Sequence, residues 1–293
     1  MLNPSQSRLL GTVCVRLAAA VASAFLATQL CAYVSNSGEP GPNVRLDLVP
    51  AGIIEARLKA APRNNREREA ALERMFEQVG CKGASLSEQP VTNQTLPNVI
   101  CNERGSSPSR IIVGAHYDKV ARGGGVVDNW SGASLLPSLF ESLHTKPHKH
   151  TFLFVAFTAE EHGLVGSKFY AKQMTPEQVA ETRAMVNIDT LALGPTKIWL
   201  NHSAPTLAGA FFALAQSMKL PVAVMNADGV GDDDSESFIR RNIPTLMVHS
   251  VTRSTWHVLH SSADNYSAVK FGDYYDSYRL LAAYLAYLDK TVQ

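Results

Sequence analysis

The segment Thr151-Phe-Leu-Phe-Val-Ala-Phe157, followed by Thr158-Ala-Glu-Glu-His-Gly163, is the most informative part of this sequence. The first seven residues are mostly aromatic or β-branched, so they predict a strand with both faces buried. Open α/β sheets place their ligand sites at the carboxyl ends of such strands. Glu160 and Glu161 stand at that end, where two carboxylates predict either a binding site or a solvated turn that enters a helix.

Short apolar runs alternate with helical patterns over the rest of the chain. This alternation predicts a single α/β domain, with a mostly parallel mixed β-sheet covered by helices on both faces. The strand candidates are residues 99–101, 111–115, 151–157, 184–188, 197–200, 222–224 and 245–248. The helix candidates are residues 64–79, 133–143, 165–173, 205–218, 235–241 and 271–288.

The composition is that of an ordinary globular protein. Hydrophobic residues make up 45% of the 293 residues and charged residues 18%, which allows a substantial core. The formal net charge is only +1, and no cluster of lysine or arginine stands out. We therefore expect no nucleic-acid partner.

The N-terminal segment differs from the rest. Arg8 and Arg16 precede the uncharged, largely apolar residues 17–34, and a linker-like stretch follows to residue 42. This pattern predicts that residues 1–42 are an export signal, or a membrane anchor through residues 17–34, plus a linker. The remaining domain would span residues 43–293. We expect an exported protein that is periplasmic, extracellular or membrane-anchored.

Only two cysteines lie outside that segment. Cys81 follows a predicted helix, and Cys101 ends a predicted strand. In an exported protein such a pair suggests a disulfide, although two separately buried thiols remain the alternative.

Potential metal ligands recur where the predicted strands end. Two histidines and several carboxylates, without a reactive cysteine among them, suit zinc or a similar divalent ion. Two metal ions bridged by one aspartate would offset the repulsion between the carboxylates and would make a hydrolytic site. Each residue taken alone has a structural explanation, such as a helix cap or a surface position. A purely structural origin of the whole set would require all these explanations to be right at once, which is a much stronger requirement than any one of them. The set comprises His116, Asp118, Asp128, Glu160, Glu161, Asp189, His260 and Asp264.

These motifs together resemble those of a known family. The chain is similar to the co-catalytic zinc aminopeptidases, which include secreted bacterial leucyl aminopeptidases and, more remotely, glutamate carboxypeptidases and glutaminyl cyclases. The resemblance runs from about residue 64 to the last helix. The motifs are His116-X-Asp118, Asp128-Asn129, Glu160-Glu161-X-Gly-X-X-Gly-Ser167, Asn187-X-Asp189 and His260-X-X-X-Asp264.

The resemblance implies a role for each matching residue. Two zinc ions per chain would be bound, one by His116 and Asp189 and the other by Glu161 and His260. Asp128 would bridge the two ions, and Glu160 would be the general base. Asp118 would contact the imidazole of His116 and orient it, without binding a metal ion itself. Asp234 resembles a position that either supports a metal ligand or binds the substrate amine, and the peptide between Asp128 and Asn129 would be cis.

The chain also departs from the family pattern. Trp130 stands where a small residue is usual, and Leu259 stands where many members have an oxyanion-binding tyrosine. Tyr117, Tyr266 or a metal ion alone would have to replace that tyrosine. His257 is a rival to His260, but only His260 is followed by the matching aspartate.

The resemblance implies a zinc-dependent exopeptidase, in particular an aminopeptidase whose substrate is a peptide with a free N-terminus. A glutaminyl cyclase, which transfers an acyl group without water, is the first alternative. A catalytically inactive binding module on the same fold is the second.

Overall fold

The protein is described here by a computed structural model that covers residues 46–226 and 231–293. The predicted N-terminal signal or anchor and the predicted domain boundary after residue 42 lie outside the described residues. Within the two covered ranges, none of the helices combines the length and apolar character needed to cross a membrane.

Eight strands form one mixed sheet in the order β1-β2-β4-β3-β5-β8-β6-β7. The central strands β4, β3, β5 and β8 run parallel to one another, and β6 and β7 are also parallel. The pairs β1–β2, β2–β4 and β6–β8 are antiparallel. The strands are β1 (Leu86–Gln89), β2 (Asn98–Glu103), β3 (Arg110–His116), β4 (Thr151–Phe157), β5 (Thr182–Ile188), β6 (Thr196–Ile198), β7 (Val222–Val224) and β8 (Thr245–His249).

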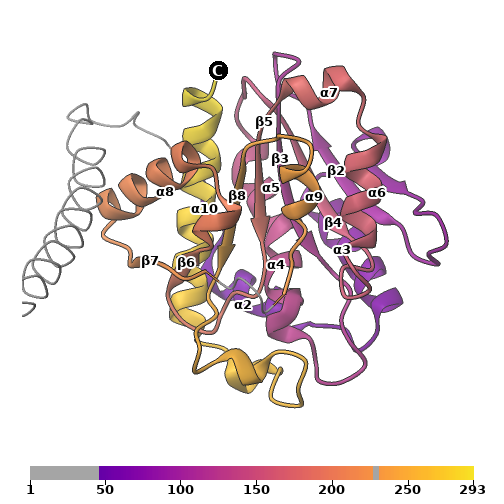
Figure 1. The fold of residues 1–293 in the computed structure, drawn as a ribbon, viewed down its shortest axis with the longest axis vertical. Coiled ribbons are helices and arrows are strands. Elements are labelled where there is room, and N and C mark those ends of the chain that lie inside the picture. Colours follow the sequence, from indigo (N-terminus) through magenta and orange to yellow (C-terminus); the bar gives the residue numbers. More distant parts are fainter. Residues whose placement is uncertain (1–45, 227–230) are drawn as a thin grey trace, which may run out of the picture. The chain divides into compact units, whose positions relative to one another are not determined.

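Helices cover both faces of this sheet (Figure 1). The alternation of side chains along each strand separates two apolar layers. Phe152, Phe154 and Ala156 of β4 pack with α2, α3, α5, α8 and α10, whereas Val155 and Phe157 pack with α6 and α9. The helices are α2 (Ala51–Lys59), α3 (Asn65–Gln78), α4 (Ser131–Ala133), α5 (Leu135–His144), α6 (Val165–Gln173), α7 (Pro176–Glu181), α8 (Pro205–Ser217), α9 (Glu236–Ile239) and α10 (Phe271–Thr291).

The predicted fold class is confirmed, and β4 has the predicted bounds. Besides the shortest turns, the sequence prediction omitted one strand, β1, and two helices, α2 and α7. β1 is an edge strand whose residues are half-buried or exposed, so it lacks an apolar run. α2 buries only Ile54 and Leu58. α7 did leave a signal, because Thr175 and Gln178 form a capping box around a proline at its first turn.

A disulfide joins Cys81, just beyond α3, to Cys101 in β2. It confirms the pairing favoured by the cysteine count and rules out two separate thiols in this structure. The bond connects α3 to the sheet.

Candidate metal centre

The candidate site lies at the carboxyl ends of three neighbouring parallel strands. β3 ends at His116, Glu160 and Glu161 follow β4, and Asp189 follows β5. Because parallel strands end at the same edge of a sheet, these side chains are brought together from distant parts of the chain. The site therefore lies where the sequence places its strand ends.

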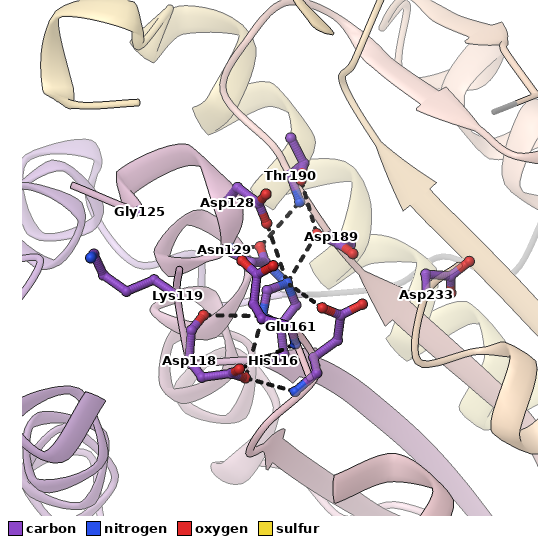
Figure 2. A network of polar contacts seen from close by, with 12 residues as sticks. His116, Asp118, Lys119, Gly125, Asp128, Asn129, Glu161, Asp189, Thr190 and Asp233 are labelled. Atoms are coloured by element: carbon purple, nitrogen blue, oxygen red, sulfur yellow. Dashed lines mark hydrogen bonds and ion pairs between the residues drawn. The ribbon is translucent and has the colours of Figure 1, made fainter. Parts of the chain in front are cut away.

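Two loops complete the cluster. Asp128 lies at a kink within the short turn η2 (Val126–Trp130), where its backbone is not helical, and His260 follows the turn η4 (Trp256–Val258). Figure 2 shows the carboxylates of Asp128, Glu161 and Asp189 gathered around His116. The ligand atoms form two groups, and within each group they lie within 4.8 Å of one another: His116, Asp128 and Asp189, and Asp128, Glu161 and His260.

Asp128 belongs to both groups. Its Oδ1 lies 3.3 Å from Nε2 of His116, and its Oδ2 lies 3.2 Å from Nε2 of His260. Each group has one further carboxylate: Asp189 Oδ1 lies 3.5 Å from Nε2 of His116, and Glu161 Oε2 lies 2.9 Å from Nε2 of His260. One aspartate thus faces two separate sets of ligands.

Glu160 belongs to neither group, although it lies beside both. Its Oε2 is 4.0 Å from Nε2 of His116, and its side chain is 11% exposed. Glu161 is its neighbour in sequence and is one of the grouped ligands. The two adjacent glutamates therefore occupy different positions, as the resemblance implied.

The charges in the cluster perturb one another. Burial would lower the pKa of His116, but the negative charges of Glu160 and Asp189 raise it well above its usual value. The contact with Asp128 raises the pKa of His260 to about 9. Burial, together with neighbouring carboxylates, raises the pKa of Glu161 to about 7 and that of Glu160 well above its usual value. Carboxyl groups are thus crowded in a buried site, where their ionised forms are disfavoured.

The cluster fits divalent metal ions. Oε1 of Glu161 is buried and has no hydrogen-bond partner among the described residues. The available ligands are imidazole nitrogen and carboxylate oxygen, which are donors that zinc accepts. Cations between these carboxylates would offset the repulsion that raises their pKa values.

Asp118 supports the cluster in two ways. Its carboxylate accepts hydrogen bonds from the backbone N–H groups of Glu160 and Glu161, at 3.0 and 3.2 Å. Its carbonyl oxygen lies 3.1 Å from Nδ1 of His116, whereas its carboxylate is 3.6 Å from that atom. The carbonyl oxygen and the carboxylate of Asp118 thus both face Nδ1 of His116, and the carboxylate also holds the backbone of the glutamate pair.

Asn129 ties the turn that carries Asp128 to the end of β5. Its Nδ2 donates to the carbonyl oxygen of Ile188 at 2.9 Å, and its Oδ1 accepts from the N–H of Thr190 at 3.1 Å. The peptide between Asp128 and Asn129 is cis, as the resemblance implied. Asp128 and Asp189 are thereby held in one framework.

A cavity of about 320 Å³ opens over the cluster. Asp232, Asp233 and Lys168 bring charge to its lining. Its apolar wall is made by Leu164, Trp199, Met247, Val251, Trp256 and Leu259. These wall residues come from separate loops and strands with no common spacing, so no sequence pattern predicts them.

Trp199 is fixed in that wall by a short chain of contacts. Its ring stacks on His202, with centroids 3.9 Å apart and planes 7° apart. Nδ1 of His202 lies 2.6 Å from Oδ2 of Asp233, and Oδ1 of Asp233 accepts from Asn187. His202 therefore connects Trp199 on the apolar side of the cavity to Asp233 on its polar side.

Asp234 does not line the cavity. It is buried, and neither of its carboxylate oxygens has a hydrogen-bond partner among the described residues. Burial raises the pKa of Asp234 to about 8. The neighbouring Asp233 is the residue that reaches the cavity, so a role for Asp234 behind the site stays a prediction.

The two candidate tyrosines are engaged elsewhere. Tyr117 donates to the carbonyl oxygen of Pro97, and Tyr266 donates to Glu55. Neither lines the cavity, whereas Leu259 does. His260 contacts the cluster, and His257 is absent from both ligand groups in the described part of the chain.

Sequence comparison places the chain in a family. Residues 98–285 match the profile of peptidase family M28, which covers more than half of the chain. The fold and site are those of a peptidase-type α/β domain, and the chain belongs to peptidase family M28.

Two curated relatives match shorter stretches. Aminopeptidase YwaD of Bacillus subtilis is 33% identical over 111 residues, which are 37% of this chain and 24% of the relative. The probable leucine aminopeptidase 2 of Aspergillus oryzae is 28% identical over 166 residues, 52% of this chain and 33% of the relative. The matches thus span about a quarter to a third of these relatives.

Solved structures share the fold. The LapA aminopeptidase of Legionella pneumophila has a TM-score of 0.71 at 18% identity, over 86% of this chain and 78% of that one. BSAP, a zinc aminopeptidase of Bacillus subtilis, has a TM-score of 0.60 at 21% identity, over 69% and 51%. The glutaminyl cyclase of Porphyromonas gingivalis has a TM-score of 0.66 at 18% identity, over 82% and 98%.

Proposed function

We propose that this chain is a zinc-dependent aminopeptidase. The observation that carries the proposal is the position of Asp128, which presents one carboxylate oxygen to His116 and the other to His260. Such a shared carboxylate suits a site for two metal ions. Membership of a peptidase family, and relatives named as aminopeptidases, support the same reaction.

The chain supplies a complete ligand set for two ions. His116 and Asp189 would hold one zinc ion, Glu161 and His260 the other, and Asp128 both. When bound, such ions lower the pKa of water and polarise a carbonyl group. The BSAP structure is described as a zinc aminopeptidase, which supports zinc as the metal.

Glu160 would move the proton. Its carboxylate lines the cavity beside both ligand groups without belonging to either. It would accept a proton from the attacking water and deliver it to the amine that leaves when the peptide bond breaks. Asp118 holds the backbone of Glu160 in place, so the carboxylate stays directed at the site.

The rest of the cavity suits the N-terminal residue of a peptide. Asp232 offers negative charge for a free α-amino group, and Asp233, whose oxygens are held by His202 and Asn187, lies beside it in the lining. The apolar wall around Trp199, Met247 and Trp256 would receive an apolar side chain. A volume of about 320 Å³ leaves room for a residue or two, which fits removal of one residue at a time.

The two alternatives are less well supported. A glutaminyl cyclase shares the fold, but the family and both curated relatives are peptidases. An inactive binding module would not need Glu160 and the complete ligand set together in one cavity.

Aminoacyl anilides and a peptide with N-terminal glutamine, each incubated with zinc-loaded protein, separate these functions. Release of aniline with leucyl substrates supports the aminopeptidase. Formation of pyroglutamate without hydrolysis would show a cyclase instead. Absence of both reactions in protein that retains its zinc would show a binding module.

We also propose that the protein is exported. The support is the basic start and the apolar residues 17–34, followed by the linker-like stretch. N-terminal sequencing of protein recovered from the medium, periplasm and membrane fractions tests this. A cleaved N-terminus near residue 42 indicates a signal, and an intact one in the membrane indicates an anchor.

A further inference from the structure

Arg68 is a fully buried arginine that the sequence motifs do not include. It lies in the first turn of α3, with 0% of its surface exposed. It continues the buried stripe of Leu72 and Phe76 at helical spacing. A guanidinium in an apolar stripe is costly to bury unless its N–H groups and its charge are satisfied.

Four backbone carbonyl oxygens accept hydrogen bonds from Arg68. Nε donates to Pro62 at 3.2 Å, and Nη1 donates to Tyr117 at 3.1 Å. Nη2 donates to Gly124 at 2.8 Å and to Gly125 at 2.7 Å. The carbonyl of Tyr117 lies between His116 and Asp118, and the two glycines lead into the turn that carries Asp128. The side chain of Arg68 thus joins the segment that follows His116 to the loop that leads to Asp128.

Gly125 is adapted to this contact. Its φ is 60°, and a Cβ at this position would lie 2.7 Å from Nη2 of Arg68. Figure 2 shows Gly125 on the side of the cluster away from Asp233. A residue larger than glycine would therefore push the guanidinium away from the loop.

The carboxylate of Asp264 binds the backbone N–H groups of the same loop. Its Oδ1 accepts from Val127 at 2.7 Å and its Oδ2 from Asp128 at 3.2 Å. Arg68 holds the carbonyls and Asp264 holds the N–H groups, so the loop is fixed by a cation and an anion. Loss of either should let Asp128 shift.

Burial lowers the pKa of Arg68 to about 10, and Trp130 and nearby carboxylates offset part of this cost. Its guanidinium carbon lies 5.5 Å from the centre of the Trp130 ring, which suits a cation–π contact. The indole Nε1 is held by the carbonyl oxygen of Arg57. The negative charge of Asp264 acts most favourably on the same guanidinium, followed by those of Asp118, Asp128 and Glu161. The large residue after Asn129 thus forms a surface for Arg68.

We propose that Arg68 is a positioning residue for the metal centre, which fixes the loops of His116 and Asp128 and offsets the charge of their carboxylates. This inference rests on the proposed function, because it takes the cluster to be a metal site. Arg68 lies outside the lining of the cavity and would act only through the ligands.

Zinc affinity, measured by competition with a chelator, tests this proposal without any substrate. The variants are Arg68→Met, which removes charge and hydrogen bonds, and Arg68→Lys, which keeps the charge but not the four carbonyl contacts. Arg74→Met is the matched control, because Arg74 is exposed on the same helix. Each metal-free variant is also melted, and each is loaded with Co²⁺ to record its visible spectrum.

We expect Arg68→Met to weaken zinc binding by about 10–100-fold, the usual effect of losing a residue that supports a metal ligand. The zinc affinity of Arg68→Lys should lie between those of Arg68→Met and the parent, and its Co²⁺ spectrum should be shifted. Arg74→Met should bind zinc as tightly as the parent. If Arg68→Met does not fold, Arg68→Lys decides by the same measure.

Zinc affinity within twofold of the parent in the folded Arg68 variants, with an unchanged Co²⁺ spectrum, would overturn the proposal even if their melting temperatures fall. Zinc binding and hydrolysis by the parent are measured first. Failure there would count against the proposed function rather than against Arg68.

Discussion

The two ligand groups share Asp128 but differ in how the chain builds them. The side chain of His116 is 2% exposed, whereas that of His260 is 57% exposed. His116 is the last residue of a central strand, and Asp189 follows the neighbouring strand. His260 lies in a loop beyond η4, with a positive φ of 55°. One half of the site is therefore part of the sheet, and the other is completed by a loop.

This difference predicts that the backbone around His116 is more rigid than the backbone around His260. Around His116, strand pairing fixes the backbone of the ligands, so few motions are open to them. Around His260, the ligand depends on a surface loop, and loops open more readily than sheets. We expect the metal held by His116 and Asp189 to be the more tightly retained of the two.

Replacement of Asp128 by alanine should have the largest effect, because it removes the one ligand that both halves share. We expect the metal content to fall from about two ions per chain to below one, with loss of hydrolysis. Metal analysis of purified protein after dialysis against a buffered chelator measures this. Retention of both ions would contradict the shared role of Asp128.

Glu160→Gln should separate chemistry from metal binding. It keeps the shape of the side chain but cannot accept the proton, so kcat should fall by about 10²–10⁴-fold, the usual contribution of a general base. Both ions should remain bound, because Glu160 is in neither ligand group. Glu161→Gln is the matched variant, and it should weaken the metal at the His260 half. Equal metal loss in the two variants would refute the division of labour between the glutamates.

Alanine at each histidine should show the contrast between the halves directly. In metal-free protein, His116→Ala removes a buried partner of several carboxylates and should cost about 3–5 kcal/mol of stability. His260→Ala removes a mostly exposed partner and should cost about 1 kcal/mol or less. Urea unfolding of both variants gives the comparison. Equal losses would mean that the two halves are equally integral to the fold.

Four of the proposed ligand and base residues can be predicted from the sequence because each stands at a strand end that apolar runs define: His116, Glu160, Glu161 and Asp189. Asp128 and His260 lie in loops, where only the family motifs point to them. Thr151–Phe157 was recognised with its full bounds, and Glu160 and Glu161 follow it at a fixed distance. Parallel strands then bring such residues to one edge without further information. Family motifs added the roles, which apolar periodicity alone does not contain.

The cavity wall and Arg68 were beyond the reach of such reasoning. The residues Trp199, Met247 and Trp256 meet only through tertiary packing, so their spacing in the sequence does not predict that they lie together. Arg68 did leave a trace, because it is a charged residue four positions before Leu72 on the buried stripe of α3. Its meaning depends on the carbonyl groups of distant loops, which a sequence pattern does not show.

The pH dependence of metal-free protein should give the smallest effect and should report the His260 half. The contact with Asp128 raises the pKa of His260 to about 9, from an ordinary value of 6.5. A raised histidine pKa adds stability below the ordinary pKa, and that stability is lost as the pH rises towards 9. The melting temperature should therefore fall between pH 7 and pH 9.5. Because His260 is largely exposed, its share should be about 2–4 °C or less.

His260→Gln distinguishes this contribution from that of His116, whose pKa is also raised. In this variant the pH dependence of the melting temperature should lose only the small contribution of His260. The contribution of the buried His116 should remain. Zinc-loaded protein should show a flatter profile in the same range, because a metal ligand must be deprotonated histidine. An unchanged profile in His260→Gln would mean that the loop histidine is not paired with Asp128 in solution, and the contrast between the halves would then be greater than the distances suggest.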